Sequence, residues 1–182
     1  MKFKFSRPMS SAVWLVAACF LVGIAAPVPA QDAMVVEQWA DYRFLIGDWM
    51  ADNPEDQGKG ECSFALDLQN KVIIRKNHAE IPASKDHPAT VHDDLLIMYW
   101  ANIYTLKADY YDSEGHIIHY TSTVSLDKDT VSFTSEQSDQ APQYRLSYVK
   151  IGDGKVAGTF EFAPPGKPGA FSPYLKWTMH RK

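Results

Sequence analysis

From residue 48 onward, apolar and polar residues alternate in short runs that are separated by turn sequences. The clearest example is YRLSYVK-IGDG-KVAGTFEF, in which two alternating runs flank Gly-Asp-Gly at 152–154. Successive side chains of a β-strand point to opposite faces, so each run predicts a strand with one apolar face. The predicted strands are 48–52, 60–68, 71–79, 94–101, 104–111, 116–126, 130–136, 143–150, 155–162 and 174–181.

The connections between these strands are short, as at DSEG (112–115) and LDKD (126–129). Short turns join antiparallel neighbours, which predicts an up-and-down sheet. So many strands in one small domain exceed what an open sheet holds comfortably, and closure removes the unpaired edges. The predicted fold class is therefore all-β: a closed antiparallel up-and-down β-barrel of about 8–10 strands, with a short N-terminal helix.

The helix is predicted from four apolar residues that precede the first strand. Val35, Trp39, Tyr42 and Ile46 are spaced at i, i+4, i+7 and i+11, and Gly47 then ends the pattern.

Two segments break the strand pattern and are predicted to be long loops. Residues 80–93 are polar with two prolines, and residues 163–173 contain four prolines and two glycines. Long loops on a compact scaffold are often functional, and the alternative is a stiff surface connection.

The first 30 residues have the pattern of a secretory signal peptide. Basic residues up to Arg7 precede an apolar run at 12–26, and PVPA then leads to a polar start at Gln31. The run is shorter than the roughly 20 apolar residues of a spanning helix, so no transmembrane segment is expected after signal removal. We predict a single barrel domain at 31–182, in the periplasm or outside the cell. The alternative is a lipoprotein, because VAAC resembles a lipobox ending at Cys19; the apolar run that continues beyond this cysteine favours cleavage after Ala30.

The net charge limits the partners that this domain can have, and the cysteine count limits its disulfide bonding. The chain has 18 basic and 22 acidic residues, and removing the three basic residues of the leader leaves 15 against 22, a net charge of about −7. This acidity argues against nucleic acid and anionic membranes as partners. Cys62 is the one cysteine left after cleavage, so an intrachain disulfide is excluded. We expect a small buried residue there; a reactive thiol is the alternative.

The stretch FLIGDWMAD, residues 44–52, places a G-x-W motif between the helix and the first strand. This arrangement resembles the calycins, the lipocalin-like barrels. The resemblance implies that Trp49, after Gly47, plugs the narrow end of the barrel, and that Arg181 from the last strand packs on it. An indole covered by a guanidinium seals such an end physically as well.

A closer likeness is carried by HDDLLIMY, ADYYDSEGHIIHY, YRLSY and FEFAPPGKP. Residues 40–182 resemble a family of secreted bacterial lipocalin-like barrels of unknown function. A more distant resemblance is to nitrobindin-type barrels, which hold haem through a histidine near the C-terminus; His180 is the residue here that matches.

Aromatic residues recur along the predicted strands and suggest a ligand site inside the barrel. Their hydroxyls favour a cavity over a filled core, because a buried hydroxyl needs a partner. The leading hypothesis is a binding protein for a small, partly apolar molecule, without cofactor or metal, and the alternative is an interior filled by these rings. The residues predicted to contact the ligand are Tyr99, Tyr110, Tyr144, Tyr148 and Phe160.

Histidines and carboxylates offer a second hypothesis, a hydrolase or isomerase with a His/carboxylate pair. The candidate residues are His92, Asp94, His119 and Asp109. His116 and His119 cannot bind one metal from a regular strand, because an odd offset points them to opposite faces. The competing interpretation of HDD (92–94) is a polar loop end. Arg75 and Arg145 are expected to pair with surface acids.

Overall fold

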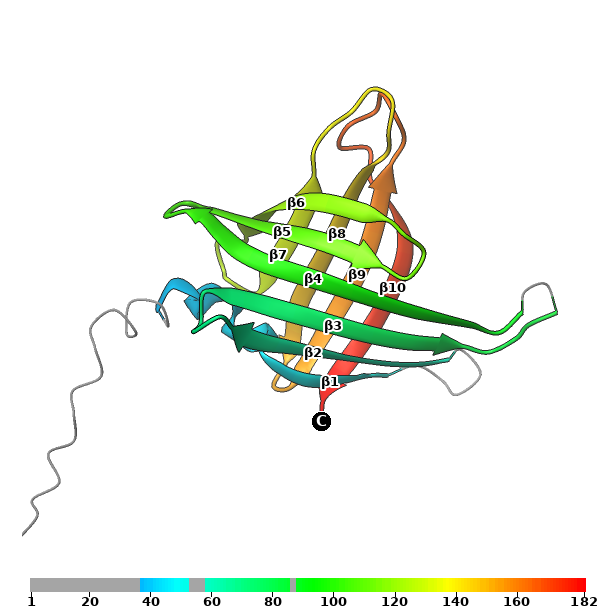
Figure 1. Cartoon of the computed structure of the whole chain (residues 1–182), viewed down its shortest axis with the longest axis horizontal. Coiled ribbons are helices and arrows are strands. Elements are labelled where there is room, and N and C mark those ends of the chain that lie inside the picture. The colour runs from blue at the N-terminus through cyan, green and yellow to red at the C-terminus, as the bar shows by residue number, and fades with distance from the viewer. Residues whose placement is uncertain (1–36, 53–57, 86–87) are drawn as a thin grey trace, which may run out of the picture.

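The computed structural model describes residues 37–52, 58–85 and 88–182, and these form a closed antiparallel barrel (Figure 1). Ten strands pair in chain order, and β1 pairs with β10 to close the sheet. The predicted fold class is confirmed. The strands are β1 (Gly47–Ala51), β2 (Lys59–Asp67), β3 (Val72–Ile81), β4 (Thr90–Asn102), β5 (Thr105–Asp112), β6 (Ile117–Val124), β7 (Thr130–Ser135), β8 (Gln143–Gly152), β9 (Lys155–Ala163) and β10 (Ser172–Arg181).

A short 3-10 helix, η1 (Ala40–Leu45), precedes β1 and buries Tyr42 and Leu45 against the barrel. The predicted helical face began at Val35, which lies outside the described residues. We call the end of the barrel that carries η1 and the β2–β3, β4–β5, β6–β7 and β8–β9 turns the closed end. The opposite end, with the β5–β6 turn and the β9–β10 connection, is called the open end.

The interior is filled by one side of each strand, as the two-residue period requires. Along β4, for example, Leu96 and Met98 are fully buried while their neighbours are partly exposed. The largest fully buried side chains are Trp39, Trp49, Tyr120, Tyr148, Phe64 and Phe133. Their rings pack edge to face, as in the pairs Phe64–Tyr148 and Phe133–Tyr148.

The two predicted loops have different outcomes. The first is wrong in part, because β3 continues to Ile81 and β4 begins at Thr90, so the two strands form a long hairpin (Figure 1). Prolines at 82 and 88 lie between the strands, where missing backbone donors cost no ladder bonds. The second prediction agrees with the structure, since β9 ends at Ala163 and β10 starts at Ser172.

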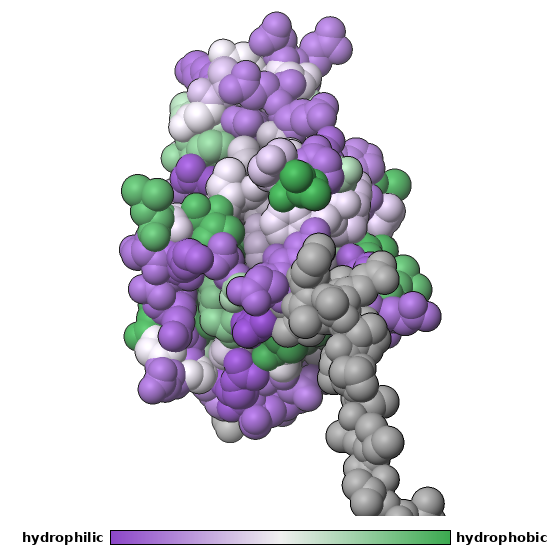
Figure 2. Space-filling model, turned by 90° about the vertical axis from the view of Figure 1, so that its left-hand side faces the viewer, coloured by the Kyte–Doolittle hydropathy of each residue, from purple (hydrophilic) through white to green (hydrophobic). Residues whose placement is uncertain are grey.

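The hairpin turns of the closed end expose apolar side chains. Leu68, Ile103, Leu126 and Ile151 are all exposed, and each lies in or beside a different turn. Figure 2 shows the side of the molecule that carries η1 and the β4–β5 turn, where hydrophobic patches are separated by hydrophilic surface. No helix among the described residues is long and apolar enough to cross a membrane. The predicted signal peptide and Cys19 lie outside the described residues.

Candidate functional site

Trp49 seals the closed end through contacts with residues just before the first strand and at the end of the last strand. Trp49 is buried, and its Nε1 donates to the Leu45 carbonyl at 2.7 Å. The Arg181 guanidinium lies 4.7 Å from the centre of the indole and donates from Nη1 to the Ile46 carbonyl at 2.7 Å. This is the geometry that the calycin resemblance implies.

Gly47 is required by the same arrangement. Its φ of +135° is a conformation that residues with a side chain rarely adopt. A Cβ at this position would lie 2.2 Å from Nη1 of Arg181. Only glycine lets the guanidinium reach the backbone of η1.

Four polar side chains from three strands meet in the interior, and we call them the Arg75 cluster: Arg75 and Asn77 of β3, Asp94 of β4 and Tyr148 of β8. Arg75 donates to the Tyr148 hydroxyl and to Asp94 Oδ1. Asn77 Nδ2 donates to Asp94 Oδ2 at 2.9 Å. Because β3 and β8 are not neighbours in the sheet, the Arg75–Tyr148 bond crosses the interior.

The Arg75 cluster is shielded from solvent. The side chains of Arg75 and Asp94 are only 6% and 4% exposed. A buried guanidinium is tolerated only when a counter-charge and hydrogen bonds compensate its lost hydration, and Asp94 supplies both. The expectation that Arg75 pairs with a surface acid is therefore wrong. Arg145 does pair with an acid, Glu161, whose side chain is 14% exposed, through Nε to Oε2 at 2.6 Å.

His92 lies beside this cluster toward the open end. Its Nε2 is 3.2 Å from the Tyr110 hydroxyl and 3.4 Å from Asp94 Oδ2, while Nδ1 is 3.1 Å from Oε1 of Glu114. The imidazole is a quarter exposed. It thus stands between buried polar groups and the solvent at the mouth of the barrel.

The inward-facing apolar side chains at the open end are only partly buried. Tyr110, Ile118, Tyr144 and Phe160 pack against the core yet keep some exposed surface. Tyr144 and Phe160 are stacked, with ring centres 5.7 Å apart and an interplanar angle of 10°. The open end therefore presents an aromatic surface that faces inward, in contrast to the buried aromatic residues of the closed end.

The charge of Arg75 acts on three tyrosine hydroxyls, and one of them, that of Tyr148, accepts a hydrogen bond from it. Burial raises the pKa of Tyr110, Tyr120 and Tyr148, and the charge of Arg75 opposes the rise in all three. These hydroxyls stay protonated at neutral pH and are available as uncharged hydrogen-bond donors.

Several predicted site residues lie on the outer face. Tyr99 alternates with the buried Met98 and points away from the interior, so the prediction that it contacts an interior ligand is wrong. Asp109 and His119 do meet, with Oδ1 and Nδ1 2.6 Å apart, but the His119 side chain is 71% exposed and the pair lies outside the barrel. The period of two places Asp109 opposite to its buried neighbour Ala108.

His180 is also on the outer face. It alternates with the buried Met179, and its Nδ1 is 2.5 Å from Asp52 Oδ1. An interior haem is therefore out of its reach, and the haem role predicted for His180 is wrong for this fold.

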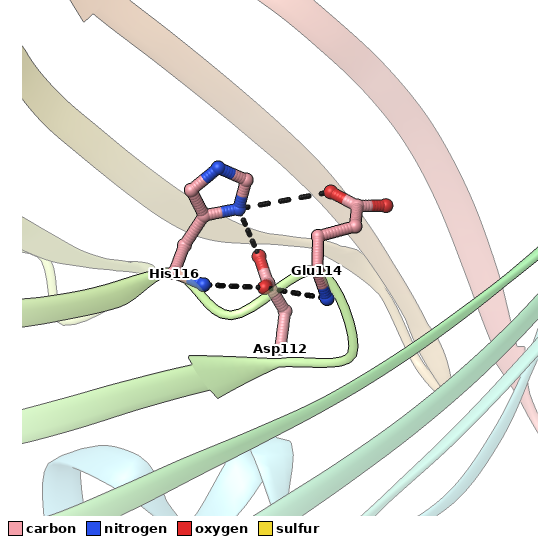
Figure 3. A group of neighbouring side chains, drawn as sticks. All are labelled: Asp112, Glu114 and His116. Atoms are coloured by element: carbon pink, nitrogen blue, oxygen red, sulfur yellow. Dashed lines mark hydrogen bonds and ion pairs between the residues drawn. The ribbon is translucent and has the colours of Figure 1, made fainter.

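At the rim of the open end, Asp112, Glu114 and His116 gather on the β5–β6 hairpin (Figure 3). Asp112 Oδ1 accepts the backbone N–H groups of Glu114 and His116 at 3.0 and 2.8 Å, and Oδ2 contacts His116 Nδ1 at 2.8 Å. Burial opposes ionisation of Asp112, but these hydrogen bonds outweigh it and lower the pKa of the carboxyl. The contacts are those of a carboxylate that fixes a turn.

Cys62 faces the barrel interior from β2, next to Met179, with the two sulfur atoms 3.7 Å apart. Burial raises the pKa of its thiol to about 11. The thiolate, which is the nucleophile, is therefore scarce at neutral pH, in keeping with a structural residue.

A shallow groove of about 340 Å³ lies across β1 to β4. Most of its lining consists of charged side chains of the outer face, such as Glu61 and His78, which pair with Lys182 and Asp93. Because these charges compensate one another, the groove offers no single chemistry to a ligand.

The sequence pattern selected five of the interior polar residues as site candidates: His92, Asp94, Tyr110, Tyr144 and Tyr148. It did not place Arg75 and Asn77 inside the barrel, and it did not select Tyr120 as a site residue. Strict alternation from the buried Ile73 does place Arg75 and Asn77 on the inner face. That signal was weak, because Ile74 makes the other face of β3 equally apolar at this point.

The barrel is similar to the crystal structure of Rv2717c from M. tuberculosis. The TM-score is 0.56 at 13% identity, and the similarity covers 80% of this chain and 97% of that chain. No protein-family model matches the sequence, and no curated protein matches it. At this identity the likeness shows that the two proteins share a barrel fold.

Proposed function

We propose that this protein binds a small, partly apolar molecule at the open end of its barrel. The ligand lies on the inward-facing aromatic side chains, with the Arg75 cluster and His92 beneath it. The observation that carries the proposal is the contrast between the two ends: Trp49 and Arg181 seal one, while Tyr144 and Phe160 remain partly exposed at the other.

The energy of binding comes mainly from apolar contact. Covering partly exposed rings removes apolar surface from water, at about 25 cal/mol per Å². The polar groups beneath set the orientation, since a few convergent polar side chains in an apolar site are typical of small-molecule sites. In line with the predicted signal peptide, we place this binding in the periplasm or outside the cell.

Native mass spectrometry tests the proposal on full-length protein that is recovered from the periplasm of a bacterial host. We expect a co-purifying molecule of defined mass, which is retained by Tyr99→Ala and lost from Tyr144→Ala. The two variants form a matched pair, because both tyrosines are partly buried but face opposite sides of the sheet. Circular dichroism of each variant establishes that the barrel is folded. A molecule retained equally by both variants, or none in the wild type, contradicts the proposal.

His92 supports a second candidate function, hydrolysis or isomerisation of a small molecule. The imidazole lies between the Glu114 carboxylate and the Tyr110 hydroxyl, which is the setting of an oriented general base. Asp94 is less available for this role because Arg75 and Asn77 already occupy its oxygens.

Hydrolysis of p-nitrophenyl esters of different chain lengths tests this candidate. A rate that falls at least about tenfold in His92→Asn and is unchanged in His119→Asn supports it. Equal rates in both variants show that His92 has no catalytic role.

A further inference from the structure

We infer that the ligand of the open end carries an uncharged carbonyl oxygen, which accepts a hydrogen bond from the Tyr120 hydroxyl beside the Arg75 guanidinium. This inference rests on the proposed function and names the chemical group that the site recognises. It draws on an observation that the binding proposal does not use, the buried donors that have no acceptor.

Three buried side-chain nitrogen and oxygen atoms have no hydrogen-bond partner within the described part of the chain: Arg75 Nε, Trp100 Nε1 and the Tyr120 hydroxyl. Buried polar groups in folded proteins are almost always paired, because an unpaired donor loses its hydration without compensation. Trp100 packs with Trp39 and Tyr42 near the closed end. The other two atoms belong to the group of side chains around the Arg75 cluster.

Tyr120 lies close enough to the Arg75 cluster for the charge of Arg75 to affect the pKa of its hydroxyl. Burial raises its pKa, the charge of Arg75 lowers it, and the hydroxyls of Tyr148 and Tyr144 raise it further. On β6, the next inward-facing residue toward the open end is Ile118, which is only partly buried. Tyr120 is therefore the first fully buried inward-facing residue of β6 below the partly exposed side chains of the mouth.

The chemistry of these atoms selects an acceptor. Nε of arginine can only donate, and a tyrosine hydroxyl can donate or accept, so a ligand group that pairs with both atoms must be an acceptor. An ammonium or an alkyl group has no lone pair to offer and would leave Nε of Arg75 unpaired.

The local charge selects an uncharged acceptor over a carboxylate. The charge of Arg75 is already balanced by Asp94, which touches it inside the barrel. An anionic ligand would therefore be desolvated without a free counter-charge, and this is unfavourable. A ketone, ester or amide carbonyl meets both conditions.

Three naphthalenes of similar size test the inference on the purified protein: 2-acetylnaphthalene with a carbonyl, 2-ethylnaphthalene without one, and 2-naphthoate with a carboxylate. Dissociation constants are measured from naphthalene and tryptophan fluorescence. We expect the ketone to bind roughly tenfold more tightly than either of the others, which corresponds to one satisfied buried hydrogen bond.

Tyr120→Phe removes only the hydroxyl. We expect the preference for the ketone to disappear while 2-ethylnaphthalene binds as before. Because the hydroxyl has no partner, thermal stability should not fall, which separates this outcome from a folding defect. The matched control is Tyr42→Phe, whose hydroxyl contacts Ser122 at 3.1 Å near the closed end; this variant should keep the ketone preference.

The outcomes distinguish the inference from the function on which it rests. If all three probes bind equally, or if Tyr120→Phe keeps the preference, the carbonyl inference is overturned and the binding function stands. If the naphthoate binds best, the site recognises anions and the charge argument is wrong. If none of the three binds, both the inference and the proposed function fail.

Discussion

Arg75 is a buried charged residue that links three strands across the interior. It joins β3 to β4 through Asp94 and to β8 through Tyr148, at the level where the filled core meets the mouth. Alternation along the sequence shows which face a residue occupies, but it does not show which side chains meet across a barrel. The pairing of Arg75 with Tyr148 joins residues 73 positions apart and depends on closure of the whole sheet. For this reason Tyr110, Tyr144 and Tyr148 were predictable as inward-facing, but the contacts that join Tyr148 to Arg75 and Asp94 were not.

Asp94→Asn is expected to destabilise the protein by about 3 kcal/mol, because it leaves the buried guanidinium without a counter-charge. Urea unfolding followed by tryptophan fluorescence measures the change. Glu161→Gln is the control: it breaks the pair with Arg145, whose side chain is 36% exposed, and should cost less than about 1 kcal/mol. Similar losses in both variants would show that Arg75 finds other compensation.

At the scale of elements, the strands were predictable because their pattern is local. Every predicted strand overlaps an observed one, and the largest shift is at β4, which begins at Thr90 instead of 94. Paired strands supply backbone partners even to a polar sequence, so HDD (92–94) extends the hairpin although its composition is typical of a loop. This shift has a consequence for the site, because it places His92 on the inner face of a strand.

The β2–β3 turn contains a conformational conflict. Leu68, Gln69 and Asn70 all have positive φ, and Leu68 is in addition 67% exposed. A side chain in the left-handed region costs roughly 1 kcal/mol, which asparagine tolerates better than leucine. We expect Leu68→Asn to raise the free energy of unfolding by about 0.5–1 kcal/mol.

Thermal unfolding of Leu68→Asn should show this gain as a higher midpoint temperature. Ile103→Asn is the matched control, since Ile103 is an exposed apolar residue in another turn of the same end but is not among the residues with positive φ. Equal shifts in the two variants would attribute the effect to lost apolar surface and not to the backbone.

At the scale of the whole molecule, closure depends on a short pairing between the first and last strands. The β1–β10 register comprises Trp49–Arg181, Met50–His180 and Ala51–Met179. Arg181 strengthens this pairing by binding the carbonyls of Ile46 and Phe44 while it covers Trp49. The G-x-W motif and the C-terminal arginine made this contact predictable, because a family resemblance supplies long-range information that periodicity lacks.

Arg181→Gln is expected to lower the stability by about 1–2 kcal/mol, through loss of a charged hydrogen bond and of the contact with the indole. The emission of Trp49 should move to longer wavelength as water reaches it, and thermal unfolding gives the stability change. Lys182→Gln removes only the surface pair with Glu61 and should have an effect below about 1 kcal/mol. An unchanged stability in Arg181→Gln would mean that the strand pairing alone holds the barrel shut.

Since the two terminal strands complete the ring together, the barrel has no independent half. A chain clipped ahead of Ser172 would lose β10 and leave β1 and β9 with unsatisfied backbone groups along their free sides. Free strand edges recruit other chains, so proteolysis near the proline-rich connection would convert the closed barrel into material that aggregates. An intact β10 therefore protects the protein from aggregation and also closes the barrel.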